Sequence, residues 1–233
     1  MVTADGRIPC ELWLSRHIAR PASDQSGKPH EVKRNRPLAT QVKRQRLPDR
    51  PQMIIEAAIP IIGQRGYYGF SIKDIAERCG VTMQGVLHHF GSKEGILHAI
   101  MEDRERRDTE ATWQDVLSDG LSGFARLELD DIKRRLHDTV VRNSQQPDVL
   151  RLYSMLRTEA LYPEHPAHKD FQGRIASAIE VLTNAFTGKL ANPASIARQI
   201  LATMSGLEDL WLETNMSFDL VEEWDRAIDK ILV

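Results

Sequence analysis

The stretch SIKDIAERCGVTMQGVLHHFGSK, residues 71–93, contains two short helical patterns with a glycine between them. Ser71 can act as a helix N-cap, and Asp74, three residues later, lies near the backbone N–H groups that a helix start leaves without partners. Gly80 stands where the first helix must end, a position that favours a left-handed backbone conformation. Thr82 can then cap a second short helix. The stretch therefore predicts two helices joined by a tight turn.

Three residues of this stretch have the spacing of a helix-turn-helix motif. Ala76 is small enough for the second helix to cross closely over the first. Gly80 follows four residues later in the turn, and Val86 comes six residues after that, on the inward face. In such a motif the second helix lies in the major groove of DNA, with its N-terminal residues toward the base edges. The alternative is a pair of ordinary packed helices that share this spacing.

The remainder of the chain has helical periodicity from residue 49 onward, without alternating strand patterns or internal repeats. A first helix follows Asp49. Pro60 within it predicts a kink or an early stop, because proline has no N–H to donate to the Glu56 carbonyl. Further helices are expected at 93–112, 121–144, 148–161, 166–190, 194–214 and 218–231. The pattern predicts an all-α fold.

Residues 1–48 mix prolines with polar and basic residues and predict a disordered basic N-terminal extension. Residues 1–50 carry 11 Lys and Arg against 5 Asp and Glu, a net charge of +6. Residues 51–233 carry 20 against 28, a net charge of −8. One hypothesis is an arm that follows the DNA backbone or enters a minor groove. The alternatives are a solvated tail, or a start codon assigned too far upstream.

Composition argues against several classes of protein. No apolar run is long enough to cross a bilayer, and Asp5, Pro9 and Glu11 are unlike a signal peptide. The two cysteines, Cys10 and Cys79, lie far apart and suggest neither a disulfide framework nor a zinc site. We therefore expect a cytoplasmic protein with no membrane partner, no cofactor and no bound metal.

RGYYGFSIKDIAERCGVTMQGVLHHFGSKEGIL, residues 65–97, resembles the DNA-binding domain of the TetR family. The resemblance rests on the aromatic residue after Gly66, the Gly-Val turn, the His-His-Phe ending and the Ser-Lys-Glu that follows. RTEALYPEHPAH (157–168) and GLEDLWL (206–212) resemble segments in the regulatory domain of one TetR subgroup, which has an LHHF recognition-helix ending and a PEHPAH segment. The resemblance spans roughly 49–231 and is strongest in the first fifty residues of that span.

The resemblance implies a three-helix DNA-binding domain at residues 49–95 and a helical ligand-binding and dimerisation domain at 96–233. It implies a transcriptional repressor rather than an enzyme. The expected partners are double-stranded DNA with a palindromic operator, a second copy of the chain, and a small-molecule effector that the sequence does not name. The operator would be bound through residues 71–93.

By position in the family, the residues expected at DNA are Ser71, Thr82, Met83, Gln84, Gly85, His88, His89 and Lys93. Gln84 can pair with adenine in the major groove, and Lys93 would meet a phosphate at the start of the next helix. Leu87 stands where the family usually has a tyrosine, which removes one expected phosphate contact. His88 and His89 point about 100° apart on a helix, which favours phosphate contact or packing over a shared metal ion.

The regulatory half offers less specific patterns. Its candidate pocket residues, expected among the helices of 93–161, are Trp113, Phe124, Tyr153 and Met155, although such residues also form ordinary core. By family position, the candidate dimer residues are Phe171, Ile175, Ile179, Leu182, Phe186, Ile200, Met204, Leu207 and Trp211. The alternative is that these stripes face the core of the chain itself.

Two other functions remain open at this level. An enzyme built on a helical bundle has little support, because the sequence has no nucleophile–base pairing, phosphate-binding loop or metal-ligand spacing. The one polar cluster that could carry out chemistry is Glu159, His165 and His168. An adaptor that has kept the fold and lost DNA affinity stays an alternative because of Leu87 and the neutral charge of residues 51–100, with four Lys and Arg against four Asp and Glu. Such an adaptor would act through a protein partner.

Overall fold

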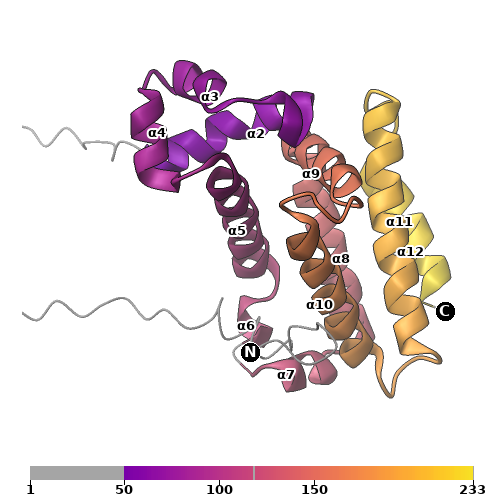
Figure 1. Cartoon of the computed structure of the whole chain (residues 1–233). Helices are drawn as coiled ribbons and strands as arrows, with labels where there is room; N and C mark the ends of the chain where they lie inside the picture. The colour runs from indigo at the N-terminus through magenta and orange to yellow at the C-terminus, as the bar shows by residue number, and fades with distance from the viewer. Residues whose placement is uncertain (1–49, 118, 233) are drawn as a thin grey trace, which may run out of the picture.

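The computed structural model describes residues 50–117 and 119–232, and all regular structure within these ranges is helical. The predicted N-terminal extension, residues 1–48, lies outside the described residues. Figure 1 shows α2 (Arg50–Gly69), α3 (Ile72–Cys79) and α4 (Met83–Phe90) grouped at one end of the chain. From this group α5 (Lys93–Thr112) leads to the other helices.

The second half of the chain contains the remaining helices. They are α6 (Gln114–Leu117), α7 (Leu121–Arg126), α8 (Leu129–Ser144), α9 (Pro147–Glu159), α10 (His168–Phe186), α11 (Pro193–Glu213) and α12 (Leu220–Ile231). In the part of the chain that is described, no helix has the length and apolar composition of a membrane span. The all-α prediction is therefore confirmed, and most helix boundaries agree with the sequence pattern to within a few residues.

Two local expectations were wrong. The early stop expected at Pro60 does not occur, because helical backbone continues past it as far as the break at Gly66, and buried Ile54, Ala58 and Ile62 pack on both sides of the proline. The helix expected at 121–144 is divided into α7 and α8. Leu127 between them is extended, and the acidic first turn of α8 favours a new helix start there.

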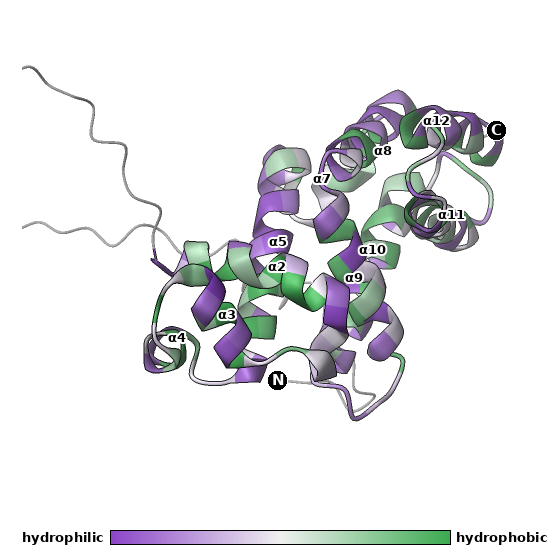
Figure 2. Cartoon of the chain, turned by 90° about the horizontal axis from the view of Figure 1, so that it is seen from above, coloured by the Kyte–Doolittle hydropathy of each residue, from purple (hydrophilic) through white to green (hydrophobic). Residues whose placement is uncertain are grey.

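Two apolar clusters form the interior. One is shared by α2, α3, α4 and α5 with Leu152 and Leu156 of α9, so the most extensive packing of α2 is against α9. The other joins α7, α8, α10, α11 and α12 around Phe124, Phe186 and Trp224. Figure 2, seen from above, shows α2 next to α5 and α9, whereas α3 and α4 lie to one side. The group formed by α2, α3 and α4 is thus built partly on a helix of the second half.

Near its end α2 is interrupted at Gly66, whose φ of 67° and ψ of 179° are not helical. The backbone N–H of the next residue, Tyr67, donates a hydrogen bond of 2.8 Å to Oε2 of Glu159 at the end of α9. A Cβ atom at residue 66 would lie 2.1 Å from Oε1 of the same carboxylate. Only glycine therefore permits both this backbone conformation and the approach of Glu159.

We expect Gly66→Ala to lower the free energy of unfolding by roughly 2 kcal/mol or more, because it combines a glycine-only backbone conformation with a steric clash. Urea unfolding monitored by circular dichroism measures this. Gly173→Ala in α10 is the matched control, since a Cβ there meets nothing within 4 Å. The control should be neutral or slightly stabilising. Equal stability of the two variants would contradict the analysis of Gly66.

Candidate nucleic-acid interface and regulatory cavity

The start of α3 has the capping box that the sequence predicts. Ser71 is the N-cap, and its hydroxyl accepts a hydrogen bond of 3.2 Å from the N–H of Asp74. The Asp74 carboxylate in turn accepts one of 2.8 Å from the N–H of Ser71. The hydrogen bond from the Ser71 hydroxyl, together with this one from its backbone N–H, lowers the pKa of Asp74. The reciprocal bonds fix the position at which the first helix of the motif begins.

The turn between α3 and α4 depends on Gly80, which has a left-handed conformation with φ 66° and ψ 32°. Its N–H donates to the carbonyl of Glu77 at 3.3 Å, and the N–H of Val81 donates to the carbonyl of Ala76 at 3.0 Å. Ala76 is 3% exposed, and Val86 of α4 is fully buried. The small residue, the turn glycine and the inward valine thus occupy the places that a helix-turn-helix requires.

The N-terminal turn of α4 presents a continuous set of accessible residues. Thr82 caps the helix, with its hydroxyl accepting a hydrogen bond of 3.0 Å from the N–H of Gly85. Met83 is 47% exposed, and Gln84 is exposed beside it. A Cβ at Gly85 would lie 3.3 Å from the Thr82 hydroxyl, so a larger residue at position 85 would crowd the capping side chain. These residues can reach base edges in a major groove.

The C-terminal turn of α4 carries His88 and His89, both exposed. Their ring centroids are 5.5 Å apart in an edge-on arrangement. Among the described residues, no group of three or more His, Cys, Asp or Glu side chains is placed to hold a metal ion. Leu87 is half-buried and has no polar group to offer a phosphate.

Lys93 begins α5, next to the N-cap Ser92, whose hydroxyl accepts a 3.1 Å hydrogen bond from Gly95. The Lys93 ammonium lies over the aromatic rings of Tyr67 and Phe70, at 4.7 and 4.4 Å from their centroids. Burial there lowers its pKa. The Lys93 side chain therefore packs on Tyr67 of α2 and on Phe70, which follows that helix.

The polar cluster that the sequence suggested as a site for chemistry, Glu159, His165 and His168, makes contacts that hold the loop between α9 and α10 in place. His165 is 2% exposed, and its Nε2 lies 3.5 Å from the Glu159 carboxylate that also binds the N–H of Tyr67. Burial lowers the pKa of His165. Nδ1 of His168 is 2.7 Å from the carbonyl of Ala160. The two histidines therefore fasten the loop between α9 and α10 rather than sharing a ligand.

A cavity of about 150 Å³ lies between α5, α7 and α10. Trp113 and Phe124 line it, with ring centroids 5.5 Å apart. Of the other two pocket candidates, Tyr153 lines a separate cavity of about 40 Å³ between α2, α5 and α9, and Met155 lines neither of these cavities and is 37% exposed. The sequence did not single out Asp108 or Arg174, which also line the larger cavity.

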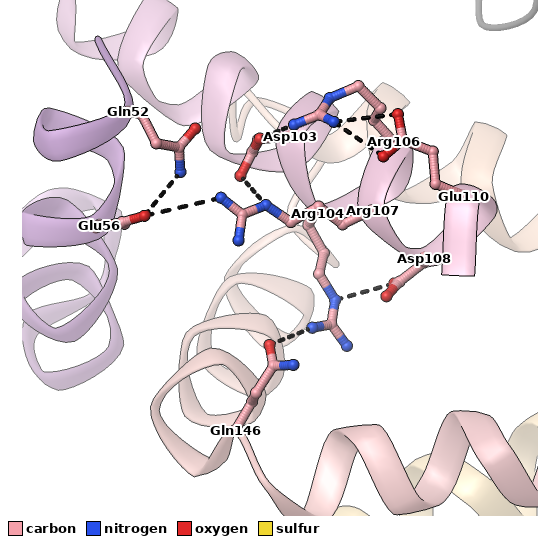
Figure 3. Close-up of polar contacts among 9 residues, drawn as sticks. All are labelled: Gln52, Glu56, Asp103, Arg104, Arg106, Arg107, Asp108, Glu110 and Gln146. Carbon is pink, nitrogen blue, oxygen red and sulfur yellow. Dashed lines mark hydrogen bonds and ion pairs between the residues drawn. The ribbon is translucent and has the colours of Figure 1, made fainter. Parts of the chain in front are cut away.

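A chain of polar side chains crosses the interior beside this cavity. Arg104 of α5 donates to Asp108 at 2.9 Å and to Gln146 at 2.9 Å (Figure 3), and also to Asn143 at 2.5 Å. Asn143 donates to Glu208 of α11 at 2.6 Å. Burial raises the pKa of Glu208 to about 7, against the lowering effect of the Asn143 hydrogen bond. The chain connects α5 with α8, the start of α9 and α11.

The candidate dimer residues fall into two groups. Four are buried in the core of the chain itself and are not free for a second copy: Leu182, Phe186, Ile200 and Trp211. The other five are half-buried or exposed: Phe171, Ile175, Ile179, Met204 and Leu207. Ile175 is 47% exposed, and on the adjacent α11 Leu210, which the sequence analysis did not include, is 52% exposed.

Comparison with known proteins bears on this geometry. Residues 54–100 match the model of bacterial regulatory proteins of the tetR family. The HTH-type transcriptional regulatory protein RaaS of Mycobacterium tuberculosis is 50% identical over 46 residues, 20% of this chain and 21% of that protein. The HTH-type transcriptional regulator BetI of Pectobacterium atrosepticum is 29% identical over 133 residues, 48% of this chain and 68% of its own. The chain thus covers about a fifth of RaaS and two thirds of BetI.

Among solved structures, SmeT, the repressor of the Stenotrophomonas maltophilia multidrug efflux pump SmeDEF, superimposes with a TM-score of 0.60 at 17% identity. The superposition covers 79% of this chain and 89% of SmeT. The chain therefore shares the fold of SmeT, and within it a helix-turn-helix at α3 and α4 is followed by a helical domain. This confirms the fold class expected from the sequence.

The buried carboxyl of Glu208 gives the protein a pH-dependent stability. Because its pKa in the folded chain exceeds the ordinary value of 4.5, the native state is stabilised below pH 4.5 and loses this contribution as pH rises toward 7. We expect the wild type to lose about 3 kcal/mol relative to Glu208→Gln between pH 4.5 and 7.5. Urea unfolding at both pH values measures it, with the exposed Glu213→Gln as control. An identical pH dependence of wild type and Glu208→Gln would contradict this.

Proposed function

We propose that this chain, a TetR-family regulator by its residues 54–100, is a transcriptional repressor that binds a palindromic operator as a homodimer and is released by a small-molecule effector. The observation that carries the proposal is the N-terminal turn of α4, where Met83 and Gln84 are exposed on a fully capped helix-turn-helix. A rigid helix with accessible residues at this end is suited to contact base edges.

The residues of this turn divide by the kind of DNA contact their chemistry allows. Gln84 can form a bidentate pair with adenine, and the apolar Met83 can contact a thymine methyl group. Ser71 and Thr82, at two helix starts, and Lys93, at a third, lie where backbone N–H groups favour phosphate. In this proposal phosphate contacts orient the domain, and Gln84 provides the sequence preference.

A homodimer would place two such helices on one operator. The exposed apolar residues Ile175 and Leu210 belong to α10 and α11, which pack against each other. Figure 1 shows these two helices at a distance from α4. Paired across a two-fold axis, α10 and α11 would form a four-helix interface. The two copies of α4 would then contact half-sites about 34 Å, or a multiple of that, apart.

The effector would act through α5, which connects the two halves. Its first residue, Lys93, follows α4 after two residues, and its last turns border the larger cavity. A ligand that moves α5 would therefore move the DNA-binding helices. It can release the operator only if it binds the DNA-free arrangement more tightly than the DNA-bound one.

The first experiment is to incubate the purified chain with sheared genomic DNA from its source, and to sequence the fragments that are bound. We expect a short palindrome, with the affinity of that site reduced about tenfold or more by Gln84→Ala. Gln145→Ala, exposed at the end of α8 and outside the proposed dimer helices, is the matched control and should bind as the wild type does. Binding without sequence preference that vanishes at moderate salt would reject the repressor and favour a protein-binding adaptor.

The dimer is tested by light scattering after size exclusion at micromolar concentration. We expect twice the mass of the chain for the wild type, and a monomer for Leu210→Glu, because a carboxylate at a buried interface has no partner. Leu161→Glu, 78% exposed in the loop after α9, is the matched control and should remain dimeric. A monomeric wild type would contradict the dimer.

A further inference from the structure

The larger cavity has an apolar side and a charged side. Trp113, Phe124 and Val181 supply the apolar surface. Glu105 and Asp108 of α5 and Arg174 of α10 supply the charges. The volume of about 150 Å³ is close to that of an engineered protein cavity that binds benzene. A ligand that fills this space has roughly the size of one aromatic ring with a small polar group.

Arg174 has hydrogen-bonding capacity to spare. It is half-buried, and its Nη2 donates to Asp108 at 3.3 Å, while its guanidinium lies 5.3 Å from the ring centroid of Tyr153. A guanidinium has five N–H donors in a planar fork that matches a carboxylate. The contact with Asp108 is made by one of these nitrogens, Nη2, and the side chain of Arg174 lines the cavity.

The charges behind Arg174 favour an anion. Asp108 faces three guanidinium groups, those of Arg104 at 2.9 Å, Arg174 at 3.3 Å and Arg142 at 3.5 Å. Asp108 therefore keeps two cationic neighbours if Arg174 turns toward a ligand. Figure 3 shows the Arg104 contact, and the other partners of Arg104 in this network, Gln146 and Asn143, are neutral. Nε and Nη2 of Arg142 are buried without a hydrogen-bond acceptor in the described residues.

We propose that the effector is a small aromatic carboxylate, whose carboxylate pairs with Arg174 and whose ring packs against Trp113, Phe124 and Val181. The proposal rests on the proposed function only in calling this ligand an effector. Glu105 also lines the cavity, and its charge disfavours an anion at that end. The ligand carboxylate is therefore directed toward Arg174 on α10. Removing the Glu105 charge should raise the affinity for an anionic ligand and lower it for a cationic one.

Isothermal titration calorimetry on the full chain tests the ligand class with three probes of matched size, benzoate, benzamide and benzylamine. Benzoate should bind at least about tenfold more tightly than the neutral amide, because a bidentate pair with a guanidinium is stronger than a neutral hydrogen bond. Benzylamine should bind more weakly still. Equal or tighter binding of benzamide or benzylamine, or no measurable binding of benzoate at millimolar concentration, would overturn the proposal.

Four variants locate the site. Arg174→Gln should weaken benzoate binding at least about tenfold, Glu105→Gln should strengthen it, and Val181→Phe should abolish it by filling the cavity. Arg226→Gln, exposed on α12, is the matched control and should bind as the wild type does. Benzoate binding unchanged by Arg174→Gln, or weakened by Glu105→Gln, would overturn the proposal. If Arg174→Gln does not fold, Val181→Phe and Glu105→Gln still decide the outcome.

Operator binding is measured separately, with and without benzoate. DNA binding that is specific but accompanied by no benzoate binding rejects the ligand class and leaves the repressor proposal standing. Benzoate binding in a chain without sequence preference for DNA rejects the repressor proposal and retains the anion site. Loss of operator affinity on adding benzoate, in the wild type and not in Val181→Phe, is the result expected if both hold.

Discussion

The packing of α2 against α9, closed by the Glu159 carboxylate at Gly66, is the constraint on which the arrangement of the two halves depends. The apolar core of the DNA-binding helices includes Leu152 and Leu156 of α9, so these helices do not form an independent body. The carboxylate occupies the space of an absent side chain and binds the N–H of Tyr67 at 2.8 Å. Rotation of the DNA-binding helices on the second half would therefore expose apolar surface and leave a charge and an amide without partners.

Local signals account for the parts of the structure that the sequence predicted well. Capping residues, turn glycines and helical periodicity act over fewer than about ten residues, and they gave the helix-turn-helix and most helix boundaries. The early helix stop expected at Pro60 does not occur, because buried residues before and after the proline can outweigh the loss of one backbone hydrogen bond. The pairing of Tyr67 with Glu159 spans 92 residues and that of Asp108 with Arg174 spans 66, and no local pattern contains such contacts.

The dimer candidates show the same limit in another form. Ile175 and Leu182 belong to one helical stripe, yet Leu182 is 4% exposed and Ile175 is 47% exposed. Helical periodicity shows which residues of α10 lie on the same face. Which residues of other helices that face contacts depends on how α10 packs against α7 and α11. Spacing predicted which residues share a face, whereas tertiary packing determined which end of that face lies in the core.

The two halves also differ in how their interiors are stabilised. The cluster shared by α2, α3, α4, α5 and α9 is built of apolar side chains. The interior between α5, α8 and α11 instead holds partly buried charges, among them Arg104, Asp108 and Glu208, beside the buried Asn143, and some of its hydrogen-bonding groups have no partner in the described residues. Buried charges of this kind contribute little net stability, so alternative pairings can differ by only a few kcal/mol.

The helix α5 connects this polar interior with the helix-turn-helix. It has 20 residues and is about 30 Å long, so a change of ion pairing at Asp108 acts on the same rigid helix that begins next to α4. The polar interior, which is the easiest part to rearrange, thus lies at the C-terminal end of α5, and the N-terminal end of the same helix positions α4.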